Sequence, residues 1–534
     1  MRMGNSPPPL EVCPCTVVSS RPVDTVSASQ EQGGAPVTAL PDFPNRRASL
    51  ILWVCLALYT IGLLIYSQTM AFVWDEGFHL LTAQLIDNGR TPYIDFCFPQ
   101  TLLNAYWNAA WMHVFGQTWR VTHVAATLLV AGTVFLTTDF VFRRFPVPQW
   151  RFPCALAVAG LTGLNDVFIP FGPIAQSYAM GLFFSVAAFR LAVSTVSRRS
   201  WLWAFAAGLC AGAAAGSTLL TAPVAPVILL WLFIYNRMGN RWHKALVFCS
   251  GCVIPFAHML ALFAKAPKQT FFNIVQYQAM FRRVNWNGAT THDIDALMAW
   301  LNSTPALLTG LLVLAGLFFL LKRSPWDRLR RAEIYLCAWL SGALILYIAT
   351  AHPTFQRYFV VAVPFCAILA TVGLYAVSLR LASPARPFWP TFLLSTLLVL
   401  SAAKLLFDDR DSTTWKHYEK IADKIREVTP PGANLYADEH VYFLLRRTPP
   451  PGMEFSYSHK LDLPPQQEAL FHIVSERELN EQVKAGKFAT VESCKDERID
   501  EMHLPELFPH QADIGDCSVF WGKVKTNQTS TTRK

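Results

Sequence analysis

The sequence is poor in charged residues and lacks the short motifs of nucleotide-using enzymes and common hydrolases. Only 15% of its 534 residues are charged, whereas 53% are hydrophobic. It contains no Walker A loop, no dinucleotide fingerprint, no H-E-x-x-H and no G-x-S-x-G elbow. The low charge argues against a soluble globular protein, and the missing motifs argue against direct use of a nucleotide.

The hydrophobic residues are gathered in blocks close to membrane-spanning length, which is roughly 20 residues. The first block begins only near Leu50 and is long enough to span, so we expect no secretory signal. The predicted fold class is a polytopic α-helical membrane protein with about eleven spans. The spans are expected at 50–70, 120–142, 152–170, 173–193, 201–217, 219–236, 245–264, 304–321, 332–350, 358–380 and 389–406.

The Lys and Arg residues lie mainly in short loops between the apolar blocks. A net charge of +9 would suggest a nucleic-acid partner for a soluble chain, but no basic stripe with a recognition fold is present. We therefore expect no binding of nucleic acid. Arg-rich loops alternate with poorer ones, and the positive-inside rule then places the N-terminus in the cytoplasm. The loop 70–119 and the C-terminal tail are expected on the outer face.

Composition divides the chain into three predicted parts. Residues 1–48 are rich in Pro, Ser, Val and Thr, which predicts a disordered cytoplasmic tail. Residues 49–407 form the transmembrane domain. Residues 408–534 are charged and Pro-rich, and their mixed patterns predict a small α/β domain outside the membrane. In this domain helices are expected at 415–428 and 476–485, and strands at 434–437, 469–474, 487–491 and 518–522.

Most of the 12 cysteines are scattered inside apolar segments, where we expect them to be small core residues. Cys494 and Cys517 differ because they lie in the polar C-terminal part. If that part faces an oxidising compartment, the two cysteines either form a disulfide or remain free thiols, and the sequence leaves both alternatives open.

The loop 70–119 places Asp75 and Glu76 directly after the first span. Acidic groups near hydrocarbon cost free energy, so those found there usually have a task. The spacing of apolar residues predicts helices over 76–86 and 102–115, joined by a short turn. Trp and Tyr side chains on these helices suit the plane of the membrane interface.

Asp75 and Glu76 are the predicted catalytic residues. Adjacent acids at the start of a helix point to different sides, so one can act while the other is structural. In the functional interpretation Asp75 is a general base that takes a proton from an attacking hydroxyl or amine. In the structural interpretation Asp75 is a helix N-cap and Glu76 is an acid of the first turn.

The predicted substrate-binding residues are spread over several loops. Arg357 precedes an apolar run, where it can hold a phosphate or extend to the interface beside Tyr358. Two consecutive arginines in the second long loop leave the same choice between phosphate contact and solvated charge. Asp95 can bind a metal or anchor its loop. The remaining candidates are Gln100, Arg282, Arg283 and His352.

Three motifs carry a resemblance to a known family. They are Trp74-Asp75-Glu76-Gly77, Pro92-Tyr93-Ile94-Asp95-Phe96 leading into Phe98-Pro99-Gln100, and Arg357-Tyr358 followed by Val363-Pro364-Phe365. Together with the many spans and the soluble outer domain, they resemble the GT-C superfamily of polytopic glycosyltransferases. The chain looks closest to bacterial relatives of the protein mannosyltransferase and aminoarabinose transferase group. The resemblance covers about residues 50–410.

The resemblance implies transfer of one sugar from a polyprenyl-phosphate donor to a protein, lipid or glycan acceptor, with inversion at the anomeric carbon. Asp75 matches the family's base or acceptor-orienting group, and Arg357 matches its contact for the donor phosphate. A divalent metal ion is left open as a cofactor, and membrane lipids are expected partners. The implied location is a bacterial inner membrane, with the C-terminal domain periplasmic or extracellular.

One departure from the family pattern argues against aminoarabinose as the sugar. Aminoarabinose transferases carry a Glu-Lys-Pro-Pro run where this chain has Pro99-Gln100-Thr101-Leu102. The missing Glu and Lys also argue against the metal site of those enzymes.

Two other functional classes are open alternatives. A secondary transporter of a polar or lipid-linked solute would need a site near the bilayer midplane, usually between internal repeats. The two halves of the chain show no such similarity, and the acids lie at the interface. A non-catalytic membrane scaffold whose tail recruits partners is the third class, and the acid-bearing amphipathic loop argues against it.

Overall fold

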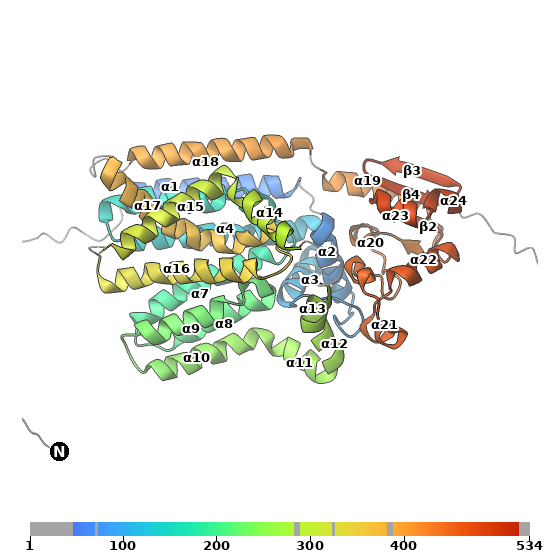
Figure 1. The fold of residues 1–534 in the computed structure, drawn as a ribbon, viewed down its shortest axis with the longest axis horizontal. Helices are drawn as coiled ribbons and strands as arrows, with labels where there is room; N and C mark the ends of the chain where they lie inside the picture. The colour runs from blue at the N-terminus through green and yellow to red at the C-terminus, as the bar shows by residue number, and fades with distance from the viewer. Residues whose placement is uncertain are drawn as a thin grey trace, which may run out of the picture. The chain divides into compact units, whose positions relative to one another are not determined.

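Eight helical segments of the described chain are long and apolar enough to cross a membrane. The computed structural model describes residues 46–69, 73–281, 289–322, 326–381, 388–411 and 413–522. Within these ranges the eight segments coincide with eight predicted spans, and Figure 1 shows them running alongside one another. The chain is an integral membrane protein, as predicted. The segments are Arg46–Ser67 (α1), Trp119–Arg144 (α4), Tyr178–Val196 (α7), Arg241–Lys265 (α10, η3 and α11), Thr304–Leu321 (α15), Arg328–Ala349 (α16), Gln356–Arg380 (η5 and most of α17) and Phe388–Asp408 (α18).

Three further predicted spans are occupied by shorter apolar helices, so the count of eleven stays a prediction. Their bounds are Arg151–Gly163 (α5) with Phe168–Phe171 (α6), Leu202–Ser217 (α8), and Leu219–Thr221 (η2) with Val224–Tyr235 (α9). Short 3-10 turns lie at Pro148–Trp150 (η1) and Ile254–Phe256 (η3), the latter dividing Arg241–Val253 (α10) from Ala257–Lys265 (α11).

Helix α8 packs on α10 with almost no side chain between the two backbones. A Cβ atom added to Gly208 would lie 2.0 Å from the Phe248 carbonyl oxygen, and one on Gly212 would lie 2.2 Å from that of Cys252. The two glycines are four residues apart and therefore face the same neighbour, which is the arrangement that lets membrane helices approach closely.

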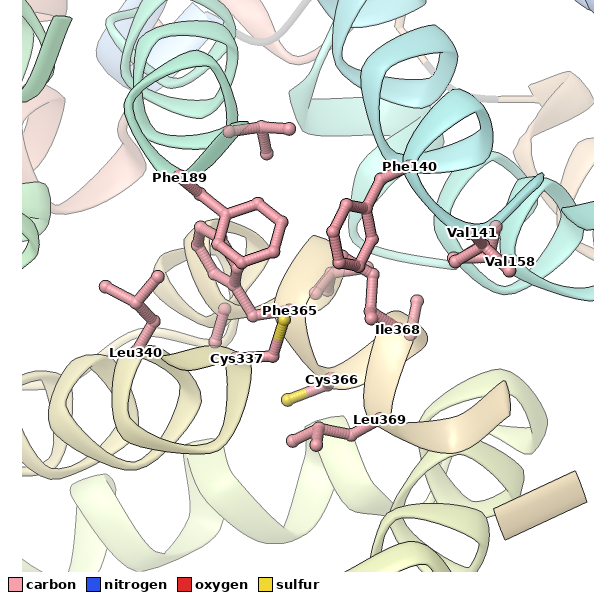
Figure 2. Close-up of a cluster of buried hydrophobic side chains, with 14 of the residues drawn as sticks. Phe140, Val141, Val158, Phe189, Cys337, Leu340, Phe365, Cys366, Ile368 and Leu369 are labelled. Carbon is pink, nitrogen blue, oxygen red and sulfur yellow. The ribbon is translucent and has the colours of Figure 1, made fainter. Parts of the chain in front are cut away.

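The core of the bundle is made of aromatic and aliphatic side chains from α4, α7, α16 and α17. Figure 2 shows these side chains converging between the helices. The rings of Phe140 and Phe189 are 4.8 Å apart, and Phe365 of α17 (Val363–Leu381) packs edge-on against Phe189 at 5.9 Å. Inter-ring packing of this kind fixes how the helices sit against one another.

The two long loops between spans contain their own helices. The first contains Val73–Asp87 (α2) and Leu103–Phe115 (α3), which confirms both predicted loop helices. The second contains five residues of helix at Pro267–Phe271 (α12), a π-helical turn at Phe272–Gln276 (η4), and the helices Tyr277–Phe281 (α13) and Ala289–Leu301 (α14). The 3-10 turn Gln356–Ala362 (η5) follows α16 and leads into α17.

The C-terminal part is the predicted α/β domain. Within residues 413–522 its four strands are ordered β1-β2-β4-β3, with β1 parallel to β2 and the other pairs antiparallel. The strands are Leu435–Tyr436 (β1), Thr490–Ser493 (β2), His510–Ile514 (β3) and Cys517–Trp521 (β4). The helices and turns are Asp409–Asp411 (η6), Trp415–Val428 (α19), Glu439–Leu445 (α20), Ser456–Lys460 (η7), Pro465–Phe471 (α21), Glu476–Lys484 (α22), Asp496–Glu501 (α23) and Leu504–Leu507 (α24).

One predicted strand of this domain is wrong, and one real strand was not predicted. Residues 469–474 were expected to be extended, but Pro465–Phe471 is a helix. Proline is well suited to a first helical turn, and the residues after Pro465 are good helix formers. Strand β3 is mostly polar and partly exposed, so it carries little apolar signal. The Cys494–Cys517 disulfide, left open by the sequence, is formed.

Candidate active site

Helix α2 carries Asp75 and Glu76 in its first turn. Successive residues of an α-helix are turned by about 100°, so the two carboxylates leave the helix on different sides. Asp75 is partly exposed, whereas Glu76 is buried. Their surroundings therefore differ, and so does the chemistry open to each.

The carboxylate of Asp75 forms an ion pair with Arg357 of η5. Asp75 Oδ2 and Arg357 Nη2 are 2.7 Å apart, and both side chains remain 18% exposed. The guanidinium also lies over the rings of Phe355, at 4.4 Å, and Tyr358, at 5.6 Å. A charged pair held by aromatic faces and still open to solvent can exchange partners with an incoming anion.

Two tyrosine hydroxyls complete this group. The Tyr457 hydroxyl lies 3.4 Å from Asp75 Oδ1, and Tyr178 hydrogen-bonds the Arg357 guanidinium. Burial, followed by the charge of Asp75, raises the pKa of Tyr457 well above its usual range. The Tyr457 hydroxyl therefore stays protonated and donates to the Asp75 carboxylate.

Glu76 lies in a fully buried network on the other side of α2. Its Oε1 accepts a hydrogen bond from the Ala175 amide at 2.8 Å and forms a second hydrogen bond with His123 Nε2. His123 Nδ1 faces the Ser67 carbonyl oxygen at 2.5 Å. Because a carbonyl oxygen only accepts, Nδ1 carries a proton and the ring is held in one orientation. These contacts tie α2 to α4, to the end of α1 and to the segment before α7.

Two predicted substrate-binding residues have structural contacts in the first loop. The Asp95 carboxylate accepts from the Thr91 amide at 2.6 Å, and the Asp95 carbonyl oxygen accepts from Arg90. These bonds close the turn and match the anchoring alternative. Gln100 is half-buried, and its carbonyl oxygen accepts from the Tyr93 hydroxyl.

The other predicted residues divide between two places. Tyr358 lies beside Arg357 and therefore next to Asp75. His352 instead pairs with Asp293 of α14, with 2.5 Å between His352 Nδ1 and Asp293 Oδ2. Arg282 and Arg283 lie outside the described residues.

The C-terminal domain contacts α2 directly. Arg90, just beyond the end of α2, forms an ion pair with Glu454 at 3.1 Å, and Gln84 donates to the Phe443 carbonyl oxygen at 3.2 Å. A Cβ atom on Gly77 would lie 3.1 Å from the His440 amide nitrogen. The glycine of the Trp-Asp-Glu-Gly motif therefore lets α20 lie against α2.

A pocket of about 230 Å³ lies in the C-terminal domain next to this group. Tyr457 belongs both to its lining and to the surroundings of Asp75. The remaining lining residues are mainly polar: Thr413, His417, Tyr418, Asp438, Glu439, His440, Ser456, Cys494, Lys495, Asp516 and Cys517. The pocket is large enough for a small polar group.

Tyr178 and Tyr457 were missed from the sequence. Each stands in a segment whose pattern is explained by burial or by turn residues, and neither is near Asp75 along the chain. No motif in the sequence marks these two tyrosines as functional. They differ from other tyrosines only by their contact with an ion pair that is distant along the chain.

No protein-family model matches the sequence, and no curated protein matches it either. The crystal structure of ArnT from Cupriavidus metallidurans in the apo state matches at a TM-score of 0.63, over 89% of this chain and 98% of ArnT. The two proteins share a fold. Sequence identity to apo ArnT is 12%. The structure of ArnT bound to undecaprenyl phosphate matches at a TM-score of 0.61 and 13% identity, with the same coverage.

The likeness to ArnT confirms the fold implied by the sequence resemblance. It extends through the membrane helices and into the C-terminal domain, because it covers 89% of this chain. The resemblance in sequence motifs covered only about residues 50–410. The structural similarity therefore adds part of the C-terminal domain, where the sequence showed no resemblance.

Proposed function

We propose that this chain is an inverting membrane glycosyltransferase that uses a polyprenyl-phosphate-linked sugar. The observation that carries the proposal is the 2.7 Å ion pair between Asp75 and Arg357, the residues that match the family's base and its phosphate contact. The fold of ArnT, a protein crystallised with undecaprenyl phosphate, supports the same class of donor. The acceptor is a protein, lipid or glycan at the same face of the membrane.

In the proposed mechanism the donor phosphate competes with Asp75 for Arg357. A phosphate can take both arms of a guanidinium in charge-assisted hydrogen bonds. Asp75 then loses its cationic partner and becomes free to accept a proton. The acceptor oxygen or nitrogen attacks the anomeric carbon, its proton passes to Asp75, and the bond from that carbon to the phosphate oxygen breaks. Arg357 holds the negative charge that remains on the polyprenyl phosphate.

Glu76 has a different part in this proposal. Its carboxylate is buried and bonded to His123 and Ala175, which leaves it no route to a substrate. Glu76 therefore positions α2, and Asp75 performs the proton transfer. Tyr457 orients the Asp75 carboxylate by donating to Oδ1.

The proposed topology places the N-terminus in the cytoplasm and the C-terminal domain on the periplasmic or extracellular side of a bacterial inner membrane. It is supported by the alternation of Arg-rich loops. A lipid-linked donor suits this side because nucleotide sugars are cytoplasmic. A secondary transporter is less well supported, since Asp75 lies on a loop helix and Arg357 and Tyr178 lie at the first residues of their apolar segments, rather than between broken helices at the midplane.

The test is a transfer assay on the full-length protein in nanodiscs. A panel of polyprenyl-phosphate sugars is offered, and release of polyprenyl phosphate is followed. Asp75→Asn is expected to lower turnover by about 10²–10⁴-fold, the usual contribution of a general base. The matched control is Asp87→Asn at the other end of α2, where the carboxylate bonds His113 and Gln117. Turnover unchanged in Asp75→Asn would refute the assignment of the base, and no turnover with any donor would refute the proposed activity.

A further inference from the structure

One face of the small sheet presents a group of metal-ligand side chains that the proposed reaction does not use. Glu492 and Cys494 are two residues apart at the end of β2, so their side chains point to the same face. Glu492 pairs with Val519 of β4, and Cys517 lies two residues before Val519. Cys517 therefore points to this face too. Helix α20, whose second residue is His440, begins next to this face, since the amide of Asp438 donates to Glu492 Oε2 at 2.9 Å.

These side chains are close enough to share one ion. A ring nitrogen of His440, a carboxylate oxygen of Glu492 and the sulfur of Cys494 all lie within 4.8 Å of one another. The Cys494 sulfur is 3.0 Å from Glu492 Oε1. The ligand atoms of a tetrahedral zinc site lie about 3.5 Å apart, given bonds of about 2.0–2.3 Å. The group would need to contract by only about 1 Å to enclose an ion.

One ring nitrogen of His440 is buried without a hydrogen-bond partner among the described residues. His440 is 1% exposed, and its Nε2 has no hydrogen-bond partner among the described residues. Buried polar atoms are nearly always satisfied, so this ring nitrogen is available to ligate an ion. His440 and Cys494 also line the 230 Å³ pocket, which offers an ion a path from solvent.

The electrostatics of the group favour a cation. Glu492 is buried, and its Oε2 accepts a hydrogen bond from the Asp438 amide at 2.9 Å. Arg498, a nearby cation, is 3.7 Å from Asp438 Oδ1 and hydrogen-bonds Tyr436. A divalent ion held at Glu492 would supply the positive charge that burial otherwise denies this carboxylate.

We propose that the C-terminal domain has a redox-controlled zinc site made of His440, Glu492, Cys494 and Cys517. The disulfide form excludes the ion, because its sulfurs are poor ligands and only the histidine and the carboxylate remain. In the reduced form two thiolates, an imidazole and a carboxylate form a four-coordinate set of the kind that Zn²⁺ prefers.

The chemistry balances through a dithiol reductant. The dithiol gives two electrons and two protons to the Cys494–Cys517 bond, becomes a disulfide itself, and leaves two thiols in the domain. Binding of Zn²⁺ then releases the two thiol protons. Because α20 lies against Gly77 of α2, the ion would hold α20 to the sheet beneath the helix that carries Asp75.

The experiment titrates Co²⁺, and then Zn²⁺ in competition, into the full-length protein in nanodiscs, with and without prior reduction by a dithiol. The reduced protein is expected to show thiolate-to-cobalt absorption that saturates at one ion per chain and is displaced by Zn²⁺. His440→Asn and Glu492→Gln should each weaken binding by at least about tenfold, the loss that removal of even an outer-shell partner causes. Cys494→Ser should lower the thiolate absorption, and the double variant Cys494→Ser, Cys517→Ser should abolish it.

Two control variants separate this site from other thiols and histidines. Cys249→Ser removes an exposed free cysteine, and His503→Asn removes an exposed histidine of the same domain. Asparagine tolerates the left-handed backbone of His503, whose φ is 54°. Both variants should bind as the parent does. The proposal is overturned if the reduced protein binds no ion, if the disulfide form binds equally well, or if folded His440→Asn and Glu492→Gln proteins retain full affinity.

Discussion

Asp75 Oδ2 lies 2.7 Å from Nη2 of Arg357, although one residue follows the first span and the other follows the sixth of the eight long apolar segments. The two opposite charges neutralise each other while no substrate is bound. The proposed base and the proposed phosphate contact are therefore bonded to each other. A donor phosphate can break this salt bridge by binding Arg357.

The role of Arg357 is tested by donor affinity. Arg357→Gln is expected to weaken binding of polyprenyl phosphate by about 10–100-fold, because a hydrogen bond to a charged group contributes about 1.5–3 kcal/mol. Binding is measured by titration of the lipid phosphate into protein in nanodiscs. Arg90→Gln is the control, since Arg90 pairs with Glu454 rather than with Asp75. Equal affinity in Arg357→Gln and the parent would exclude Arg357 as the phosphate contact.

Glu76 and His123 are expected to stabilise the fold rather than to act on a substrate. Both side chains are fully buried, and removal of one partner from a buried pair typically costs about 3–5 kcal/mol. Glu76→Gln should therefore lower the free energy of unfolding markedly, whereas Glu427→Gln, on the exposed face of α19, should not. Thermal unfolding followed by Trp fluorescence measures both. A Glu76→Gln protein of normal stability that has lost turnover would instead restore Glu76 as a catalytic residue.

Gly77 tests the contact between α2 and the C-terminal domain. An added Cβ would lie 3.1 Å from the His440 nitrogen and 3.3 Å from its Cβ, so Gly77→Ala must move α20 away from α2. We expect a loss of about 1–3 kcal/mol in unfolding free energy, typical of overpacking, together with slower turnover. Gly62→Ala is the matched control, because nothing lies within 4 Å of its Cβ position. Identical stability of the two variants would show that α20 does not rest on Gly77 in solution.

His459 gives the C-terminal domain an acid-sensitive stability. Burial lowers the pKa of His459 to about 4 from 6.5, against the opposing hydrogen bond to the Val474 carbonyl oxygen. The charges of Arg498 and Lys495 also lower the pKa of His459, whereas the charge of Asp438 raises it. A histidine with a lowered folded pKa contributes stability above pH 6.5 that is lost as the pH falls toward 4. The full loss is about 3 kcal/mol, since one pKa unit corresponds to about 1.4 kcal/mol.

The measurement is the unfolding temperature between pH 7.5 and pH 4.5 for the parent and for His459→Asn. The Asn amide can still donate to the Val474 carbonyl oxygen but does not titrate. The variant should lose less stability on acidification than the parent. Some acid sensitivity should remain, because burial also lowers the pKa of His79 to about 3. Parallel curves for the two proteins would contradict this prediction.

Local pattern determined much of this molecule. Membrane spans depend on the apolar content of one continuous stretch, so hydropathy alone located eight of them. Helix 415–428 was predicted with its observed bounds because its apolar residues recur with helical spacing. Asp75 and Arg357 were predicted from their own neighbours in the sequence, and their roles as base and phosphate contact stay predictions.

Tertiary structure alone decided which of these groups meet. No periodicity shows that Arg357 reaches Asp75, that Tyr457 arrives from a separate domain, or that Glu76 turns inward to His123. Such contacts join residues from 47 to 382 positions apart, and they depend on how whole helices pack. The pairing of Cys494 with Cys517 likewise follows from the register of β2 and β4. A sequence states which side chains are available, while packing across long separations selects the few that act together.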